Sequence, residues 1–185
     1  MICIIACGSN KVTDIKSNLA QIGVESEIIS MEDTIDTDFD IYSGIIISGS
    51  PILVTEDGMD EHLEKFKFLQ DYKKPVLGIC FGHQVLSLLH GASGFIGDAV
   101  KRDELVEIIE PGTLFAGIDN KTYFCQNHCE YMSVPNDFIL LAKSDSCQNE
   151  AMSHKTKPLF GVQFHPEVSG VAGHTLLRNF VKLCE

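Results

Sequence analysis

Short hydrophobic segments alternate with amphipathic segments through the first half of the chain. Short apolar runs are typical of buried strands, whereas apolar residues at a spacing of three to four are typical of helices. The predicted strands are 2–6, 24–29, 44–48 and 75–79, and the predicted helices are 12–22, 58–72 and 83–90. Because strands that alternate with helices form parallel sheets covered on both faces, this half predicts an open α/β sheet.

After about residue 100 the helical periodicity gives way to a series of strands. The predicted strands are 104–109, 122–126, 138–143, 150–154 and 158–164, and a last helix is predicted over about 173–184. No repeat, low-complexity stretch or linker interrupts the pattern. The sequence therefore predicts one domain over residues 1–185, with a mainly parallel sheet flanked by helices.

Composition and charge exclude several classes of protein. Hydrophobic residues make up 44% of the 185 residues and charged residues 22%, an ordinary balance for a globular protein. The net charge of −12 argues against nucleic-acid binding, which needs clustered Lys and Arg. No apolar run is long enough to span a membrane, and the N-terminus lacks a basic leader. We therefore expect a cytoplasmic protein that binds neither nucleic acid nor membranes.

The first candidate for chemistry is a cysteine between a predicted strand and a predicted helix. Residues 78–82 read Gly-Ile-Cys-Phe-Gly and follow the apolar run 75–77. This is the cysteine form of the nucleophile elbow, a sharp turn whose glycines give room for close packing of helix and strand. A cysteine at the start of a helix can have its thiol pKa lowered. Cys80 is therefore the candidate nucleophile.

A base for this nucleophile follows a later predicted strand. His165 and Glu167 come directly after the strand 158–164, in the run His-Pro-Glu. In open α/β sheets the site lies at the carboxyl ends of the strands, where Cys80 is also expected. In extended geometry Glu167 would point to the same side as His165 and orient its imidazole. The three residues predict a Cys-His-Glu triad.

The tetrahedral intermediate of such a reaction needs an oxyanion hole. The amide of Phe81, next to the nucleophile, is the natural first donor. The turn Ser-Gly-Ser-Pro at 48–51 follows a neighbouring strand, and we assign the second donor to Ser50. Cys80 would attack a carbonyl carbon to form a thioester, with His165 moving the proton. The sequence predicts a cysteine-nucleophile enzyme.

The seven cysteines do not predict a disulfide framework or a metal site. Their number is odd and they are scattered along the chain, which fits reduced thiols. Residues 125–129 read Cys-Gln-Asn-His-Cys, a run that contains metal-binding residue types. Because a second convincing pair of ligands is missing, zinc is disfavoured and no metal is predicted.

These motifs resemble those of the class I (triad) glutamine amidotransferases. The resemblance covers essentially the whole chain, and is carried by residues 48–51, 78–84 and 161–167. It implies a flavodoxin-like fold and hydrolysis of the side-chain amide of glutamine to glutamate and ammonia, without a cofactor. It also implies that the residues that bind the substrate are Gly49, Gln84, Asn127 and His128.

A narrower resemblance is to the separate glutaminase subunit of archaeal-type GMP synthase. It rests on residues 140–145, 147–152 and 154–158. It implies a partner ATP-pyrophosphatase subunit, which binds ATP and magnesium, adenylates xanthosine monophosphate and accepts the ammonia. The chain departs from the family at Ser50, where glycine is usual, and at 125–129, which replaces a Ser-His-Lys-Asp type of segment.

Other functions stay open at this point. The same chemistry could serve a different synthetase or a stand-alone γ-glutamyl hydrolase. A homologue that binds a partner without turnover is a third reading, against which the intact Cys80, His165 and Glu167 speak. A fourth is a cysteine hydrolase or chaperone with a related elbow, and the position of Gln84 and the His-Pro-Glu order favour an amidotransferase instead.

Overall fold

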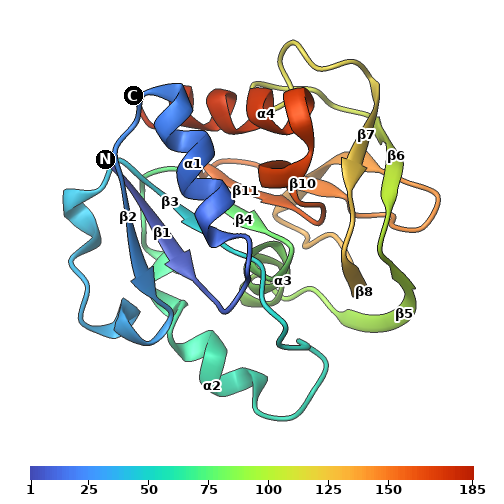
Figure 1. Cartoon of the computed structure of the whole chain (residues 1–185). Helices are drawn as coiled ribbons and strands as arrows, with labels where there is room; N and C mark the ends of the chain where they lie inside the picture. The colour runs from blue at the N-terminus through green and yellow to red at the C-terminus, as the bar shows by residue number, and fades with distance from the viewer.

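A nine-stranded sheet runs through the centre of the molecule, as Figure 1 shows for the computed structural model, which describes residues 1–185. Five neighbouring strands are parallel, in the order β2 (Ser26–Ser30), β1 (Ile2–Ala6), β3 (Gly44–Ile47), β4 (Val76–Ile79) and β11 (Leu159–Val162). This is the flavodoxin-like strand order, in which ligands bind at the carboxyl ends of the strands. The predicted α/β class is confirmed.

The sheet continues beyond β11 with four antiparallel strands. They are β10 (Ala151–His154), β9 (Phe138–Lys143), β6 (Asp103–Ile108) and β7 (Lys121–Cys125). A separate two-stranded sheet pairs β5 (Gly94–Val100) with β8 (His128–Met132). The sequence did not predict β5 and β8. In β5, Phe95 and Ile96 are both exposed and two glycines interrupt the run, so the alternation that marks a half-buried strand is missing.

Helices cover both faces of the parallel strands. Figure 1 shows α1 (Val12–Ile22) and α4 (Gly170–Leu183) side by side over one face, while α2 (Met59–Glu64) and α3 (Phe81–Leu89) lie toward the other. The two-residue period of β1 supplies both interfaces: Ile2 and Ile4 belong to the core under α1 and α4, and Cys3 and Ile5 to the core under α3. None of the helices has the length and apolar character that a membrane span requires.

The single helix predicted over 58–72 is wrong. The chain instead forms α2, which ends at Glu64, and a short 3₁₀ helix, η3 (Lys67–Gln70). The backbone leaves the α-helical region at Phe66, with φ −110° and ψ 2°. This break buries both Phe66 and Leu69 completely in the core beside α3, which a continuous α-helix did not provide. Two further 3₁₀ helices, η1 (Glu32–Ile35) and η2 (Phe39–Ile41), precede β3.

Candidate active site

The turn between β4 and α3 holds Cys80 in a backbone conformation that only close packing can maintain. Cys80 has φ 51° and ψ −102° and is the one non-glycine residue with positive φ. Side chains are excluded on both sides of it: a Cβ on Gly78 would lie 2.3 Å from the carbonyl oxygen of Gly82, and one on Gly82 would lie 2.5 Å from that of Ile47. The Cys80 N–H donates to the Val162 carbonyl oxygen at 2.8 Å, so the elbow is fixed to β11.

His165 and Glu167 form a buried pair at the end of β11. Nδ1 of His165 and Oε1 of Glu167 are 2.8 Å apart, and the two residues are 3% and 6% exposed. The expectation that Glu167 follows in extended geometry is wrong, because it lies in a 3₁₀ turn, η4 (Pro166–Val168). Two bonds fix this turn: Asn18 Nδ2 donates to the Glu167 carbonyl oxygen at 3.1 Å, and Ser169 Oγ donates to that of His165 at 2.6 Å.

The imidazole of His165 lies beside the nucleophile. A Cβ on Gly49 would lie 3.1 Å from His165 Cε1 and 3.6 Å from Cys80 Cβ, so both side chains flank one point. Burial alone lowers the pKa of His165, but Cys80 and Glu167 outweigh burial and raise this pKa to about 9. Because Glu167 holds Nδ1, the buried and otherwise unpartnered Nε2 is the nitrogen that can exchange a proton with Cys80 or a substrate.

Two backbone amides are free at the predicted oxyanion hole. Phe81 is the first residue of α3, so its N–H has no acceptor within the helix. The Ser50 N–H donates to no other group of the protein, while the Ser50 Oγ accepts from the N–H of Ile52 at 3.1 Å. Ser50 follows β3, the neighbour of β4 in the sheet. The arrangement is compatible with the predicted roles of Phe81 and Ser50.

Two cavities meet at Cys80. The smaller has a volume of about 260 Å³ and the larger about 350 Å³. Four residues line both of them, namely Ser50, Pro51, Cys80 and Asn127. The rest of the larger cavity is formed by residues 8–11 and His165. The rest of the smaller one is formed by Ile52, Leu53, Gln84, Ala99, Lys101, His128, Cys129 and Glu130. A substrate carbonyl at Cys80 can therefore have its two ends in different cavities.

Three of the four residues that the resemblance assigned to substrate binding line the smaller cavity: Gln84, Asn127 and His128. Burial lowers the pKa of His128 to about 4, so its ring is neutral, and neither ring nitrogen has a hydrogen-bond partner in the protein. The Asn127 carbonyl oxygen is 3.9 Å from Cys80 Sγ. Gly49 lines neither cavity and instead packs against Cys80 and His165.

Sequence reasoning missed three residues near the nucleophile. Nε2 of Gln163, on the segment before His165, lies 3.7 Å from Cys80 Sγ. Lys101 is the one positively charged side chain that lines the smaller cavity, and Glu130 is the one acidic side chain there. Glu130 is 2% exposed although ionised carboxylates are almost never buried without partners. An acidic residue directly before the apolar pair Tyr131 and Met132 was the available signal.

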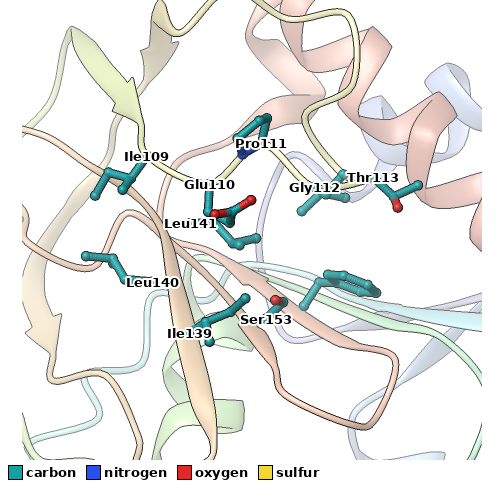
Figure 2. A pocket seen from close by; sticks show the side chains of 11 residues that line it. Ile109, Glu110, Pro111, Gly112, Thr113, Ile139, Leu140, Leu141 and Ser153 are labelled. Atoms are coloured by element: carbon teal, nitrogen blue, oxygen red, sulfur yellow. The ribbon is translucent and has the colours of Figure 1, made fainter.

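A further cavity, about 460 Å³ in volume, lies away from the triad (Figure 2). It is formed by the segment 109–114 and by residues of β9, β10 and β11, and its lining contains neither cysteine nor histidine. The labelled side chains in Figure 2 are largely apolar, with Glu110 and Ser153 among the polar ones. This cavity has no pair of nucleophile and base, so the chemistry belongs to the cavities at Cys80.

One cluster has the composition of a metal site. Ligand atoms of His90, Asp137 and His154 all lie within 4.8 Å of one another. However, Nδ1 of His154 accepts from the N–H groups of Thr156 and Lys157, each at 3.0 Å. The neutral ring therefore carries its proton on Nε2, which then has no lone pair for a metal. Cys125 and Cys129 belong to no cluster of three or more ligating side chains.

Comparison with known proteins gives a consistent result over the whole chain. The profile of the family described as glutamine amidotransferase class-I matches residues 3–184. The glutamine-hydrolyzing subunit of GMP synthase from Pyrococcus abyssi is 37% identical over 191 residues, covering 100% of this chain and 98% of that protein. The same subunit of the Methanocaldococcus jannaschii enzyme is 37% identical over 196 residues, covering 100% and 97%.

Solved structures agree with this result. A protein from Thermoplasma acidophilum, provisionally assigned to the GMP synthase subunits of this kind, matches with a TM-score of 0.90 and 28% identity, over 99% of this chain and 92% of that chain. A glutamine amidotransferase from Thermotoga maritima has a TM-score of 0.82 at 17% identity, over 100% and 97%, which shows a shared fold.

Proposed function

Because the chain belongs to the class I glutamine amidotransferase family, we propose that it is the glutaminase subunit of a two-subunit GMP synthase. It hydrolyses glutamine to glutamate and ammonia, and a separate synthetase subunit uses the ammonia to convert xanthosine monophosphate to GMP. The relatives named as glutamine-hydrolyzing GMP synthase subunits support this acceptor, since the chain spans nearly their whole length. The observation that carries the chemistry is Cys80 on its elbow beside the pair of His165 and Glu167.

The first half of the reaction forms a thioester. Cys80 Sγ attacks the amide carbon of glutamine, and the carbonyl electron pair moves onto oxygen, where the N–H groups of Phe81 and Ser50 stabilise the oxyanion. As the intermediate collapses, the C–N bond breaks and His165 gives its proton to the leaving nitrogen, which departs as ammonia. Glu167 keeps the imidazole oriented and stabilises its charge, as the 2.8 Å contact requires.

The second half releases glutamate. His165, now neutral, takes a proton from a water molecule that attacks the thioester carbon, and the carbonyl oxygen again becomes an oxyanion. Collapse of this intermediate breaks the C–S bond, which frees the carboxylate of glutamate and returns the sulfur to Cys80. The same three residues and the same two amides therefore act in both steps.

The two cavities give the reaction a direction. Glutamine lies in the smaller cavity, whose Lys101 attracts the α-carboxylate and whose Gln84 and His128 supply polar contacts. His165 lines the larger cavity, so the nitrogen that it protonates leaves on that side, past residues 8–11. ATP and magnesium bind to the partner synthetase subunit, which receives the ammonia.

Ammonia release tests this function directly. The purified chain, with glutamine as substrate, is expected to produce glutamate and ammonia in equal amounts, and Cys80→Ala is expected to abolish both products without unfolding the protein. Addition of the synthetase subunit with xanthosine monophosphate, ATP and magnesium is expected to yield GMP. Ammonia release by Cys80→Ala at the wild-type rate would refute the mechanism. Faster hydrolysis of other γ-glutamyl amides, with no GMP formed, would favour a stand-alone hydrolase.

A further inference from the structure

The buried carboxylate of Glu130 holds a segment that includes the oxyanion turn. Glu130 lies on β8 and its side chain accepts three hydrogen bonds. The donors are the N–H of Val54 at 2.7 Å, the N–H of Thr55 at 2.8 Å and the hydroxyl of Thr55 at 2.6 Å. Burying an ionised carboxylate is costly unless such donors compensate it, so the carboxylate and the segment fix each other.

No other group of the protein holds this segment by hydrogen bonds. Within residues 50–56, the N–H of Ile52 donates to Ser50 Oγ and the N–H of Glu56 donates to the Leu53 carbonyl oxygen. These bonds are internal to the segment, and all of the bonds that leave it go to Glu130. The segment has no helix or strand of its own. The position of its first residue, Ser50, therefore depends on Glu130 and on the preceding strand, β3.

The same residue is also in contact with the elbow helix. The carbonyl oxygen of Glu130 is 3.4 Å from Nε2 of Gln84, which lies one turn after Cys80 in α3. Glu130 thus bonds to the segment that carries the Ser50 amide and to the helix that begins with the Phe81 amide. The oxyanion hole needs these two amides at a fixed separation, since its donors act only when they are preorganised.

We propose that Glu130 is a positioning residue for the oxyanion hole, which sets the Ser50 amide relative to Phe81 and Cys80. The inference rests on the proposed glutaminase function, and it concerns the rate of the chemical step. Glu130 does not take part in proton transfer, because three donors already occupy its carboxylate. Its effect is exerted through residues 50–55.

Glu130→Gln tests the proposal with little change in volume. If the amide oxygen of glutamine takes the place of Oε1, its NH₂ group faces the N–H of Val54, a donor against a donor. We expect kcat for glutamine hydrolysis to fall by about 10² and KM to change only a few-fold. Binding of glutamate γ-semialdehyde, whose adduct with Cys80 carries an oxyanion, is expected to weaken by a similar factor.

Alkylation of Cys80 by iodoacetamide separates positioning from general damage. This reaction needs the nucleophile and His165 but no oxyanion hole, so its rate at Cys80, followed by mass spectrometry, is expected to stay within about twofold. Glu27→Gln is the matched control, because the Glu27 carboxylate accepts from the Tyr42 hydroxyl at 2.6 Å, away from the site. This control is expected to keep wild-type kcat.

The outcomes are distinct. Unchanged kcat in Glu130→Gln, or alkylation that falls as much as kcat, would overturn the positioning role. A wild-type protein that releases no ammonia would refute the proposed function, and this inference with it. If Glu130→Gln does not fold, Glu130→Asp keeps the charge but withdraws it by one methylene group. A loss of kcat with normal alkylation is again expected there, and a normal kcat would again overturn the proposal.

Discussion

At the scale of single residues, the site depends on groups held where they would not otherwise stay. A non-glycine residue at positive φ costs on the order of 1–3 kcal/mol, and Cys80 is kept there by its bond to β11 and by the crowding around Gly78 and Gly82. His165 carries its raised pKa despite burial because Glu167 is 2.8 Å away. The nucleophile and its base are therefore arranged before any substrate arrives.

This arrangement predicts a shift in the pH profile of Glu167→Gln. The wild-type His165 has a pKa of about 9, so the imidazolium that protonates the leaving nitrogen is lost as the pH rises through that value. Removing the carboxylate lowers this pKa, and we expect the alkaline limb of kcat/KM to move down by about one pH unit or more. Steady-state ammonia assays between pH 6 and about pH 10 measure it. An unmoved limb would show that Glu167 does not set the charge of His165.

His165→Ala gives the comparison for this experiment. Loss of the proton carrier is expected to be nearly as damaging as Cys80→Ala, whereas Glu167→Gln should keep part of its activity because water or backbone can partly replace an orienting group. A wild-type rate in His165→Ala would remove this residue from the mechanism.

The residues of the triad could be predicted from the sequence because each lies in a short motif with a local geometry. Glu130 could not, because its role depends on contacts with Val54 and Thr55, which are 76 and 75 positions away in the sequence. The pairing of His165 with Glu167 was predicted, but from the wrong backbone conformation, since a 3₁₀ turn rather than extended chain brings the two together.

At the scale of elements, strong periodicity was the best guide. The helix predicted over 12–22 coincides with α1, whose buried Val12, Ile15 and Leu19 recur at helical spacing and whose end is capped by Gly23 at φ 91°. The predicted strand 138–143 coincides with β9. The break in helix 58–72 was not predictable in this way, because it depends on the core that Phe66 and Leu69 enter.

A buried pair connects the antiparallel strands to the site. Nε2 of Gln126, beside Asn127, donates to Oε1 of Glu150 at 2.9 Å. The remaining oxygens of both side chains, Gln126 Oε1 and Glu150 Oε2, are buried without partners. Burial raises the pKa of Glu150 to about 7, and the charge of Glu104 adds to this effect. A proton on Glu150 Oε2 is the group that would satisfy Gln126 Oε1, as in an acid–amide pair.

Glu150→Gln is therefore expected to remove a pH dependence of stability. The folded wild type keeps its proton up to about pH 7, whereas the unfolded chain loses it near its ordinary pKa of about 4.3. Wild-type stability should fall between these values, by up to roughly 3 kcal/mol, relative to a variant that is neutral throughout. Urea unfolding of both proteins at about pH 5 and pH 8 measures the difference. Parallel stability curves would show that Glu150 is charged in the folded state.

At the scale of the whole molecule, the topology brings the parts of the site to one edge of the sheet. The elbow follows β4, the oxyanion turn follows the neighbouring β3, and the His-Pro-Glu segment follows β11 on the other side of β4. Strand order and chain order differ here, since β11 joins the parallel strands late. The sequence predicted that these segments meet, because the carboxyl ends of parallel strands share an edge, but it did not predict the division of the site into two cavities.

The last prediction concerns control of the glutaminase by its synthetase. Ammonia formed without an acceptor is wasted, so a separate glutaminase benefits from being slow alone. Ser50 lacks the access of glycine to positive φ, and its amide is one of two oxyanion donors, worth about 10²–10³ in rate. We expect the isolated chain to be slow and the synthetase, loaded with nucleotide and ATP, to raise kcat by up to about that factor, by favouring the competent turn. Ser50→Gly should raise kcat of the isolated chain and reduce the activation. Ammonia assays on the chain alone and in the loaded complex decide the matter, and equal kcat values in both would exclude this turn as the point of control.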